Sequence, residues 1–142
     1  MIFPDVNLLL YATDANSKFH TAAAGWLNTI LLNEQVFFSW HTITGFLRLS
    51  THPSASVQPL TLANAISLVD EWLALENTHL VSMEKKSWPL FRSILIDGQA
   101  SGNLVMDAHI AAMAASCGAG VATTDRDFSR FSQIRITNPL VR

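Results

Sequence analysis

Two stretches decide the fold that the sequence predicts: NLVMDAHI at residues 103–110 and VATTD at residues 121–125. The first places the carboxylate of Asp107 at the start of a helical pattern. The second places Asp125 at the end of a short apolar run, which is typical of a buried strand. The N-terminus repeats the second arrangement, because Asp5 follows Met-Ile-Phe-Pro. If the fold brings these three aspartates together, the protein is built around a metal-binding acidic pocket.

Short apolar runs and helical patterns alternate along the chain. We expect strands at residues 2–5, 36–38, 79–82, 121–124 and 134–136. We expect helices at residues 6–13, 17–32, 42–49 and 106–117, two more that begin near residues 61 and 87, and a helical turn at residues 126–131. Strands that alternate with helices favour parallel pairing, with helices on both faces. The predicted fold class is therefore α/β, a single domain over residues 1–142 built as a three-layer α/β/α sandwich with a central, mostly parallel sheet.

Several residues are candidates for helix ends. Ser17 and Thr61 are predicted N-caps, because each has a side-chain oxygen and stands just before an apolar helical pattern. Gly118 is the predicted left-handed residue that ends the helix before it. The proline-containing segment 52–59 is predicted to be a loop.

The composition excludes several classes of protein. A chain of 142 residues, 49% hydrophobic and 14% charged, is long and apolar enough for a globular domain with a real core. Its one cysteine, Cys117, excludes an internal disulfide and a cysteine-based zinc site. A net charge of −2 argues against a general nucleic-acid coat, but not against an enzyme with a small acidic metal site. Without a secretion signal or an apolar run that could span a bilayer, we expect a cytoplasmic protein with no membrane partner.

The three aspartates are expected to meet because binding sites in open parallel sheets form at the carboxyl ends of the strands, where the strand order reverses. Clustered carboxylates repel each other unless a cation neutralises them. Oxygen ligands without cysteine or paired histidine favour Mg²⁺, with Mn²⁺ as the other candidate. Taken singly, each aspartate has a simpler explanation, as a helix-start residue for Asp107, a turn former for Asp125 and a cap for Asp5. Their joint positions favour the metal site.

Four segments in order resemble the PIN-domain family, and more narrowly the VapC-type toxins of type II toxin–antitoxin systems. The segments are FPDVNLL at residues 3–9, TGFLRLST at 44–51, GNLVMDAH at 102–109 and TTDRDF at 123–128. The resemblance covers most of the chain. It implies a Mg²⁺-dependent endoribonuclease that hydrolyses phosphodiester bonds in RNA (tRNA, rRNA or mRNA), is neutralised by a cognate antitoxin protein, and forms a homodimer.

The resemblance also assigns residues. It implies that Asp5, Asp107 and Asp125 are the catalytic, metal-binding acids. Asn7 would orient Asp5, and Thr124 would support Asp125.

This chain departs from the family at one position. Most members carry a glutamate where this sequence has Gly45, although a subgroup also reads Gly-Phe-Leu-Arg there. The change removes one charge from the pocket. Asp127 is the candidate to replace that charge, and a solvated turn residue is the alternative. We therefore expect the site to bind one metal ion firmly and a second one weakly or not at all.

The remaining polar residues have two interpretations each. Arg48 and Arg126 are candidates to bind RNA phosphates, and a solvated surface position is the alternative for both. Arg130 is expected to be solvated. We expect His109 to be structural.

Two other functions compete with the toxin. Because of Gly45, an inactive PIN domain that serves as a binding module stays open. A receiver domain or a dehalogenase-like phosphatase would also use an aspartate after the first strand. Both need a late lysine, and no lysine follows Lys86; the phosphatase also needs an acid at Asn7.

Overall fold

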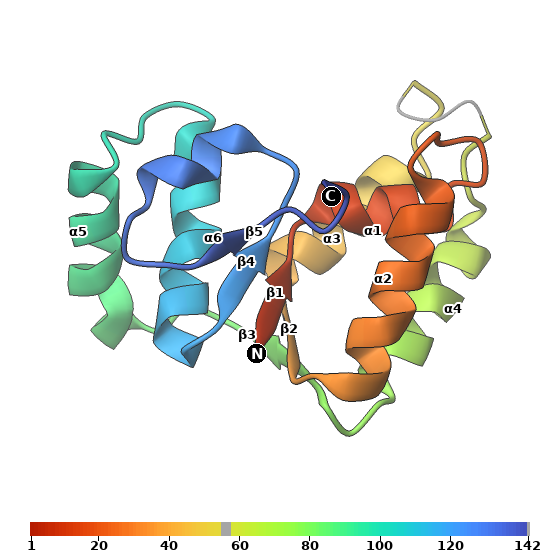
Figure 1. Cartoon of the computed structure of the whole chain (residues 1–142), viewed down its shortest axis with the longest axis horizontal. Helices are drawn as coiled ribbons and strands as arrows, with labels where there is room; N and C mark the ends of the chain where they lie inside the picture. Colours follow the sequence, from red (N-terminus) through yellow and green to blue (C-terminus); the bar gives the residue numbers. More distant parts are fainter. Residues whose placement is uncertain (55–57, 142) are drawn as a thin grey trace.

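The computed structural model describes residues 1–54 and 58–141, and its centre is one five-stranded sheet (Figure 1). The strands are β1 (Ile2–Pro4), β2 (Val36–Ser39), β3 (Thr78–Val81), β4 (Gly120–Ala122) and β5 (Ile136–Thr137). Their order across the sheet is β3-β2-β1-β4-β5, and every neighbouring pair is parallel. The predicted parallel sheet is confirmed.

Helices cover both faces of this sheet. One layer holds α1 (Val6–Thr13), α2 (His20–Asn33), α3 (Trp40–Ser50) and α4 (Leu62–Leu73). The other holds α5 (Trp88–Asp97) and α6 (Leu104–Cys117), with the 3₁₀ turns η1 (Lys85–Ser87) and η2 (Arg126–Arg130). Figure 1 shows the two groups of helices on opposite sides of the strands. The three-layer α/β/α sandwich predicted from the sequence is confirmed.

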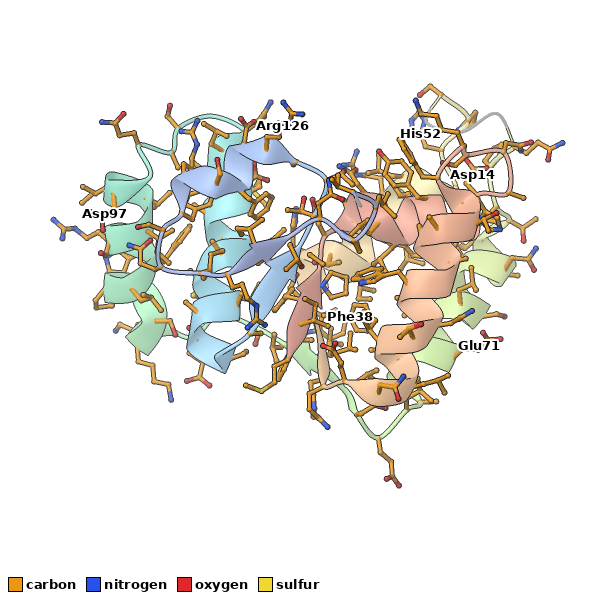
Figure 2. All side chains as sticks on the ribbon, viewed as in Figure 1. Asp14, Phe38, His52, Glu71, Asp97 and Arg126 are labelled. Atoms are coloured by element: carbon orange, nitrogen blue, oxygen red, sulfur yellow. The ribbon has the colours of Figure 1, made fainter. Side chains whose placement is uncertain are left out.

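Alternating side chains of the strands supply two separate cores. In β1, Ile2 packs with α1 to α4, whereas its neighbour Phe3 packs with α6 and η2. Phe38 of β2 joins the first core, where Figure 2 shows it between the sheet and the helices. Because successive residues of a strand point to opposite faces, a strand that is buried on both sides reads as an unbroken apolar run. This explains why such short strands are visible in the sequence.

The strand order reverses at β1. The chain runs outward from β1 to β2 and β3, then returns to place β4 on the other side of β1. Pro4 of β1 pairs with Ala122 of β4, so the residues that follow these two strands start at the same edge of the sheet. Asp5 follows β1 directly, and the segment after β4 leads through Thr123 to Asp125.

Two helix ends follow the sequence prediction. The Thr61 hydroxyl accepts a hydrogen bond from the Asn64 backbone N–H (3.1 Å), and Gly118 ends α6 with a φ of 66°. Left-handed backbone of this kind is easiest for glycine.

Several predicted boundaries were wrong. Ser17 is not the cap of α2: its hydroxyl accepts from the Phe19 N–H in a preceding turn, and the helix begins at His20. Strand β4 stops at Ala122, and β5 lies at Ile136–Thr137. Residues 55–57 of the predicted loop lie outside the described residues.

Candidate metal centre

A cavity of about 160 Å³ lies at the sheet edge where the strand order reverses, between α1, α3 and α6. Three carboxylates that are far apart in the sequence line it together: Asp5, Asp107 and Asp125. Figure 1 shows how the fold achieves this, because the ends of β1 and β4 and the start of α6 converge. The structure therefore brings together the three aspartates whose proximity the sequence suggested.

Asp5 is the buried and most firmly held carboxylate of the three. It is only 6% exposed. Its Oδ1 accepts from the Val6 backbone N–H and its Oδ2 accepts from the Thr123 hydroxyl, both at 2.7 Å. Burial raises the pKa of Asp5 above its ordinary value, and the negative charge of Asp125 adds to this, while the two hydrogen bonds and nearby His41 act in the opposite direction. The two donors fix the carboxylate, so its remaining lone pairs have a defined direction.

Thr123 links Asp5 to the segment that carries Asp125. Its hydroxyl donates to Asp5 and accepts from the backbone N–H of Asp125 (3.0 Å). Thr124 was predicted to support Asp125, but within the described part of the chain the hydrogen bond to the Asp125 backbone comes from Thr123 and the Thr124 side chain makes none. Thr123 takes the role because it extends β4 beside Asp5, where its side chain is buried.

Asp107 stands in the first turn of α6, as predicted. Its pKa is raised to about 6, first by burial and then by repulsion from Asp125, Asp5 and Asp127, with Arg130 opposing these effects. An acid whose ionisation is hindered by other acids gains most from a bound cation. The raised pKa values of Asp107 and Asp5 therefore both fit a cation site.

Asp127 also faces this cluster. The carboxylate oxygens of Asp107, Asp125 and Asp127 lie within 4.8 Å of one another. The Asp125 side chain accepts from the Asp127 backbone N–H (2.9 Å), which turns the chain so that both acids stay together. Asp5 is not part of this close group but lines the cavity from the β1 side. Three carboxylates thus line the cavity, and the fourth, Asp127, lies close to two of them.

The donor set fits Mg²⁺ or Mn²⁺. Hard divalent cations of this kind prefer carboxylate oxygen, and neither cysteine nor a pair of histidines lines the cavity. Cys117 lies at the far end of α6, where burial raises the pKa of its thiol and keeps it protonated. The residues that would hold the ion are Asp5, Asp107 and Asp125, with Asp127 as the further candidate.

The cavity wall on α3 is not acidic. Gly45 and Arg48 line it, as does His41, which the sequence analysis missed. A Cβ atom at Gly45 would meet only Val6 Cγ2, at 3.6 Å, so the backbone leaves room for a side chain there. His41 could have been found from its spacing, since residues 41, 45 and 48 recur on one face of a helix.

Asn7 and Arg126 fit their predicted roles less well than Arg48 does. Asn7 lines the cavity, but the two side-chain hydrogen bonds that orient Asp5 come from other residues. Arg126 lies outside the acidic cavity, beside a shallower depression that it shares with Thr124. Figure 2 shows its side chain at the outer surface of η2.

Arg130 is exposed, as predicted, and it also makes two hydrogen bonds. Its guanidinium donates to the carbonyl oxygens of Gly98 (3.0 Å) and Gln99 (3.4 Å). These carbonyls end α5, so Arg130 attaches the turn that carries Asp125 and Asp127 to the corner before α6.

A parallel α/β fold with acids grouped at the sheet edge is the arrangement of a PIN domain, and the family model described as PIN domain matches residues 2–134. The chain belongs to the PIN-domain family, and within it to the VapC group. Ribonuclease VapC33 of Mycobacterium tuberculosis is 32% identical over 141 residues, which cover 99% of each chain. Ribonuclease VapC37 of the same organism is 34% identical over 136 residues, which cover 95% of this chain and 94% of the relative.

Solved structures confirm the fold. VapBC2 from Rickettsia felis, bound to a DNA fragment from its promoter, matches with a TM-score of 0.68 and 18% identity over 97% of this chain and 98% of that chain. VapC20 from M. tuberculosis, a toxin that cleaves the sarcin–ricin loop, matches with a TM-score of 0.65 and 17% identity over 95% and 99%.

In the described part of the chain, no helix combines the length and the apolar character needed to cross a bilayer.

Proposed function

We propose that this protein is the toxin of a type II toxin–antitoxin system and acts as a Mg²⁺-dependent endoribonuclease, with Mn²⁺ as an alternative ion. Its substrate is RNA (tRNA, rRNA or mRNA), in which it hydrolyses phosphodiester bonds. One observation carries the proposal: three aspartates from distant parts of the chain line one cavity at the point where the strand order reverses. The relatives named as VapC ribonucleases and the solved toxin–antitoxin pairs support it.

The side chains divide the work. Asp5, Asp107 and Asp125 would hold the ion, and Thr123 and the Val6 N–H keep Asp5 in position. A divalent ion at such a site lowers the pKa of bound water and neutralises charge on a phosphoryl oxygen. A carboxylate oxygen of these aspartates that is not bound to the ion would accept a proton from the attacking water. Asp127 adds negative charge at the exposed side of the cluster.

The substitutions Asp5→Asn and Asp107→Asn test the proposal. Each keeps the shape of the side chain and removes a charge, so we expect RNA cleavage to fall by at least about 100-fold, as is typical when a group that stabilises the transition state is lost. Asp70→Asn, at an exposed position of α4, is the matched control and should keep full activity. Circular dichroism would verify the fold. Full cleavage by a folded Asp5→Asn variant would rule out this site.

Calorimetric titration with Mn²⁺ tests the number of ions. Because Gly45 supplies no carboxylate, we propose one firm site, and a second site that is weak or missing. Two tight sites in the native protein would contradict this.

The proposed partners are a cognate antitoxin protein and a second copy of the chain, and the proposed location is the cytoplasm. If a small protein is encoded beside this gene, its co-expression should restore growth; no rescue by it would count against that protein as the antitoxin.

Gly45 favours a second candidate function, a catalytically weak or inactive PIN domain that binds a partner or RNA. Expression in a bacterial host separates the two. Growth arrest that Asp5→Asn abolishes supports the ribonuclease, whereas equal effects of both proteins support the binding module.

A further inference from the structure

The acidic cavity has one wall of opposite character. His41, Gly45 and Arg48 occupy positions i, i+4 and i+7 of α3, and all three line the cavity that Asp5, Asp107 and Asp125 also line. Residues with this spacing lie above one another on one face of a helix. These three residues form what we call the α3 wall: His41 and Arg48 are basic, and Gly45 leaves a gap between them.

The two basic side chains are free to bind a ligand. Both are exposed, and within residues 1–54 and 58–141 neither side chain makes a hydrogen bond or an ion pair. If Arg48 served to neutralise the neighbouring carboxylates, it would be expected to form an ion pair with one of them. His41 is near enough for its charge to lower the pKa of Asp5. Its ring also carries at least one N–H in either protonation state.

Gly45 keeps the space between these residues open. Only Val6 Cγ2 approaches the position of its missing Cβ, at 3.6 Å, so the gap is not filled from elsewhere in the fold. Its φ is not among the positive ones, so the backbone does not require glycine. The absence of a side chain at this position thus creates room beside the metal centre.

A bound RNA phosphate would require positive charge on one side of this acidic cavity. The chain has a net charge of −2, three carboxylates line the cavity, and Asp127 lies close to two of them. A single divalent ion neutralises only part of that charge, so the phosphodiester would still meet repulsion on the acidic side. Donors of positive charge on the opposite wall counter this, and charge-assisted hydrogen bonds to phosphate are among the strongest available.

We propose that the α3 wall is the phosphate-binding subsite of the enzyme. His41 and Arg48 donate to the non-bridging oxygens of the RNA phosphate beside the metal centre, and Gly45 leaves the room that this phosphate occupies. The inference rests on the proposed ribonuclease function. On this proposal, the glycine at position 45, where most family members carry a glutamate, provides room for the substrate phosphate.

Binding of a short fluorescent RNA by anisotropy, with EDTA and separately with Mn²⁺, tests the subsite, alongside calorimetric titration of Mn²⁺. We expect His41→Gln and Arg48→Gln each to weaken RNA binding about tenfold, the loss of one charge-assisted hydrogen bond in a solvated site. Arg48→Gln should also reduce the slope of log affinity against log salt concentration by about 0.7. Mn²⁺ affinity should not change in Arg48→Gln. Arg92→Gln, at an exposed position of α5 outside the cavity, is the matched control.

Gly45→Glu tests whether the gap at Gly45 serves to bind the RNA phosphate or is only a lost metal-binding position. We expect weaker RNA binding, because the carboxylate fills the space and repels phosphate, while Gly45→Ala should have a much smaller effect. Tighter Mn²⁺ binding with unchanged RNA binding in Gly45→Glu would overturn the subsite, as would equal RNA affinity of His41→Gln, Arg48→Gln and Arg92→Gln.

The outcomes also separate this inference from the proposed function. RNA that binds and is cleaved, with no loss in the α3 variants, overturns the subsite alone. Weaker binding in these variants without any cleavage supports the subsite and contradicts the ribonuclease. Failure of the native protein to bind RNA in either buffer contradicts both.

Discussion

At the scale of single residues, Thr123 is the link between the two acids that follow β1 and β4. We predict that Thr123→Val destabilises the fold by about 1–3 kcal/mol, because a buried carboxylate and a backbone N–H each lose a partner. The pKa of Asp5 should rise further, so Mn²⁺ should bind less tightly at neutral pH. Denaturant unfolding and calorimetry measure the two effects.

Thr124→Val is the control for this substitution. The same side chain is lost one residue later, where the hydroxyl makes no hydrogen bond within the described residues, so a change below about 0.5 kcal/mol is expected. Equal destabilisation by the two variants would show that Thr123 has no special role.

Asp107 makes the stability of the metal-free protein depend on pH. Its pKa rises from 3.8 to about 6 on folding, so between about pH 4 and pH 6 the folded state holds more protons than the unfolded state. The stabilising contribution is complete below about pH 4 and is lost as the pH rises through 6. We predict that the melting temperature in EDTA falls less steeply across this range in Asp107→Asn than in the native protein. Identical pH profiles of the two proteins would contradict the environment described for Asp107.

Metal affinity should change in the opposite direction. A carboxylate must lose its proton to bind the ion, so Mn²⁺ should bind more tightly as the pH rises from about 5 to 7. Calorimetry in two buffers of different ionisation enthalpy would detect the released proton. A pH-independent affinity with no proton release would argue against Asp107 as a ligand.

At the scale of elements, the packing of η2 on the end of α5 holds the acid-bearing turn in place. A Cβ atom at Gly98 would lie 2.6 Å from the Phe131 ring, and Arg130 donates to the Gly98 carbonyl. We predict that Gly98→Ala destabilises the protein by about 1–3 kcal/mol through overpacking and lowers Mn²⁺ affinity by shifting Asp125.

Gly25→Ala provides the comparison. Gly25 lies in α2, and no atom comes within 4 Å of its missing Cβ. Alanine there should stabilise the protein by about 0.5–1 kcal/mol through helix propensity. If both variants shifted the denaturation midpoint in the same direction, the role of the Gly98 contact would have to be rejected.

Periodicity predicted the elements well and their ends poorly. The apolar patterns of α3, α4 and α6 are long enough to define a helix. By contrast, the end of β4 and the cap of α2 depend on hydrogen bonds to distant segments or to local turns. Thr123 rather than Thr124 faces Asp5 because of the β1–β4 register, which no local pattern contains.

At the scale of the whole molecule, α5 offers a surface for the proposed homodimer. Trp88 and Ile96 are 53% and 58% exposed and lie two turns apart on one face of the helix. Exposed apolar groups of this size often mark an interface. We predict that Ile96→Glu shifts the protein from dimer to monomer in light scattering after gel filtration. Leu32→Glu, at an exposed position of α2, should leave the dimer intact.

The three acids and their position at one edge of the sheet could be predicted from the sequence. The alternation of strands and helices predicts a parallel sheet, and the family resemblance assigns the acids. The sequence also named Asp127 as a candidate for the same pocket, but neither the close grouping of Asp127 with Asp107 and Asp125 nor the basic α3 wall with His41 could be derived from it. Both depend on how α3 and α6 pack across the sheet edge. The hydrogen bonds of Arg130 could not be predicted for the same reason, since its partners lie about thirty residues earlier in the chain.

Anomalous diffraction from crystals soaked in Mn²⁺ would show which carboxylates hold the ion. The proposed metal site predicts one strong peak in the cavity, bonded to carboxylate oxygens of Asp5, Asp107 and Asp125. The absence of a peak there, or a peak bound only by Asp107, Asp125 and Asp127 with Asp5 uninvolved, would contradict it.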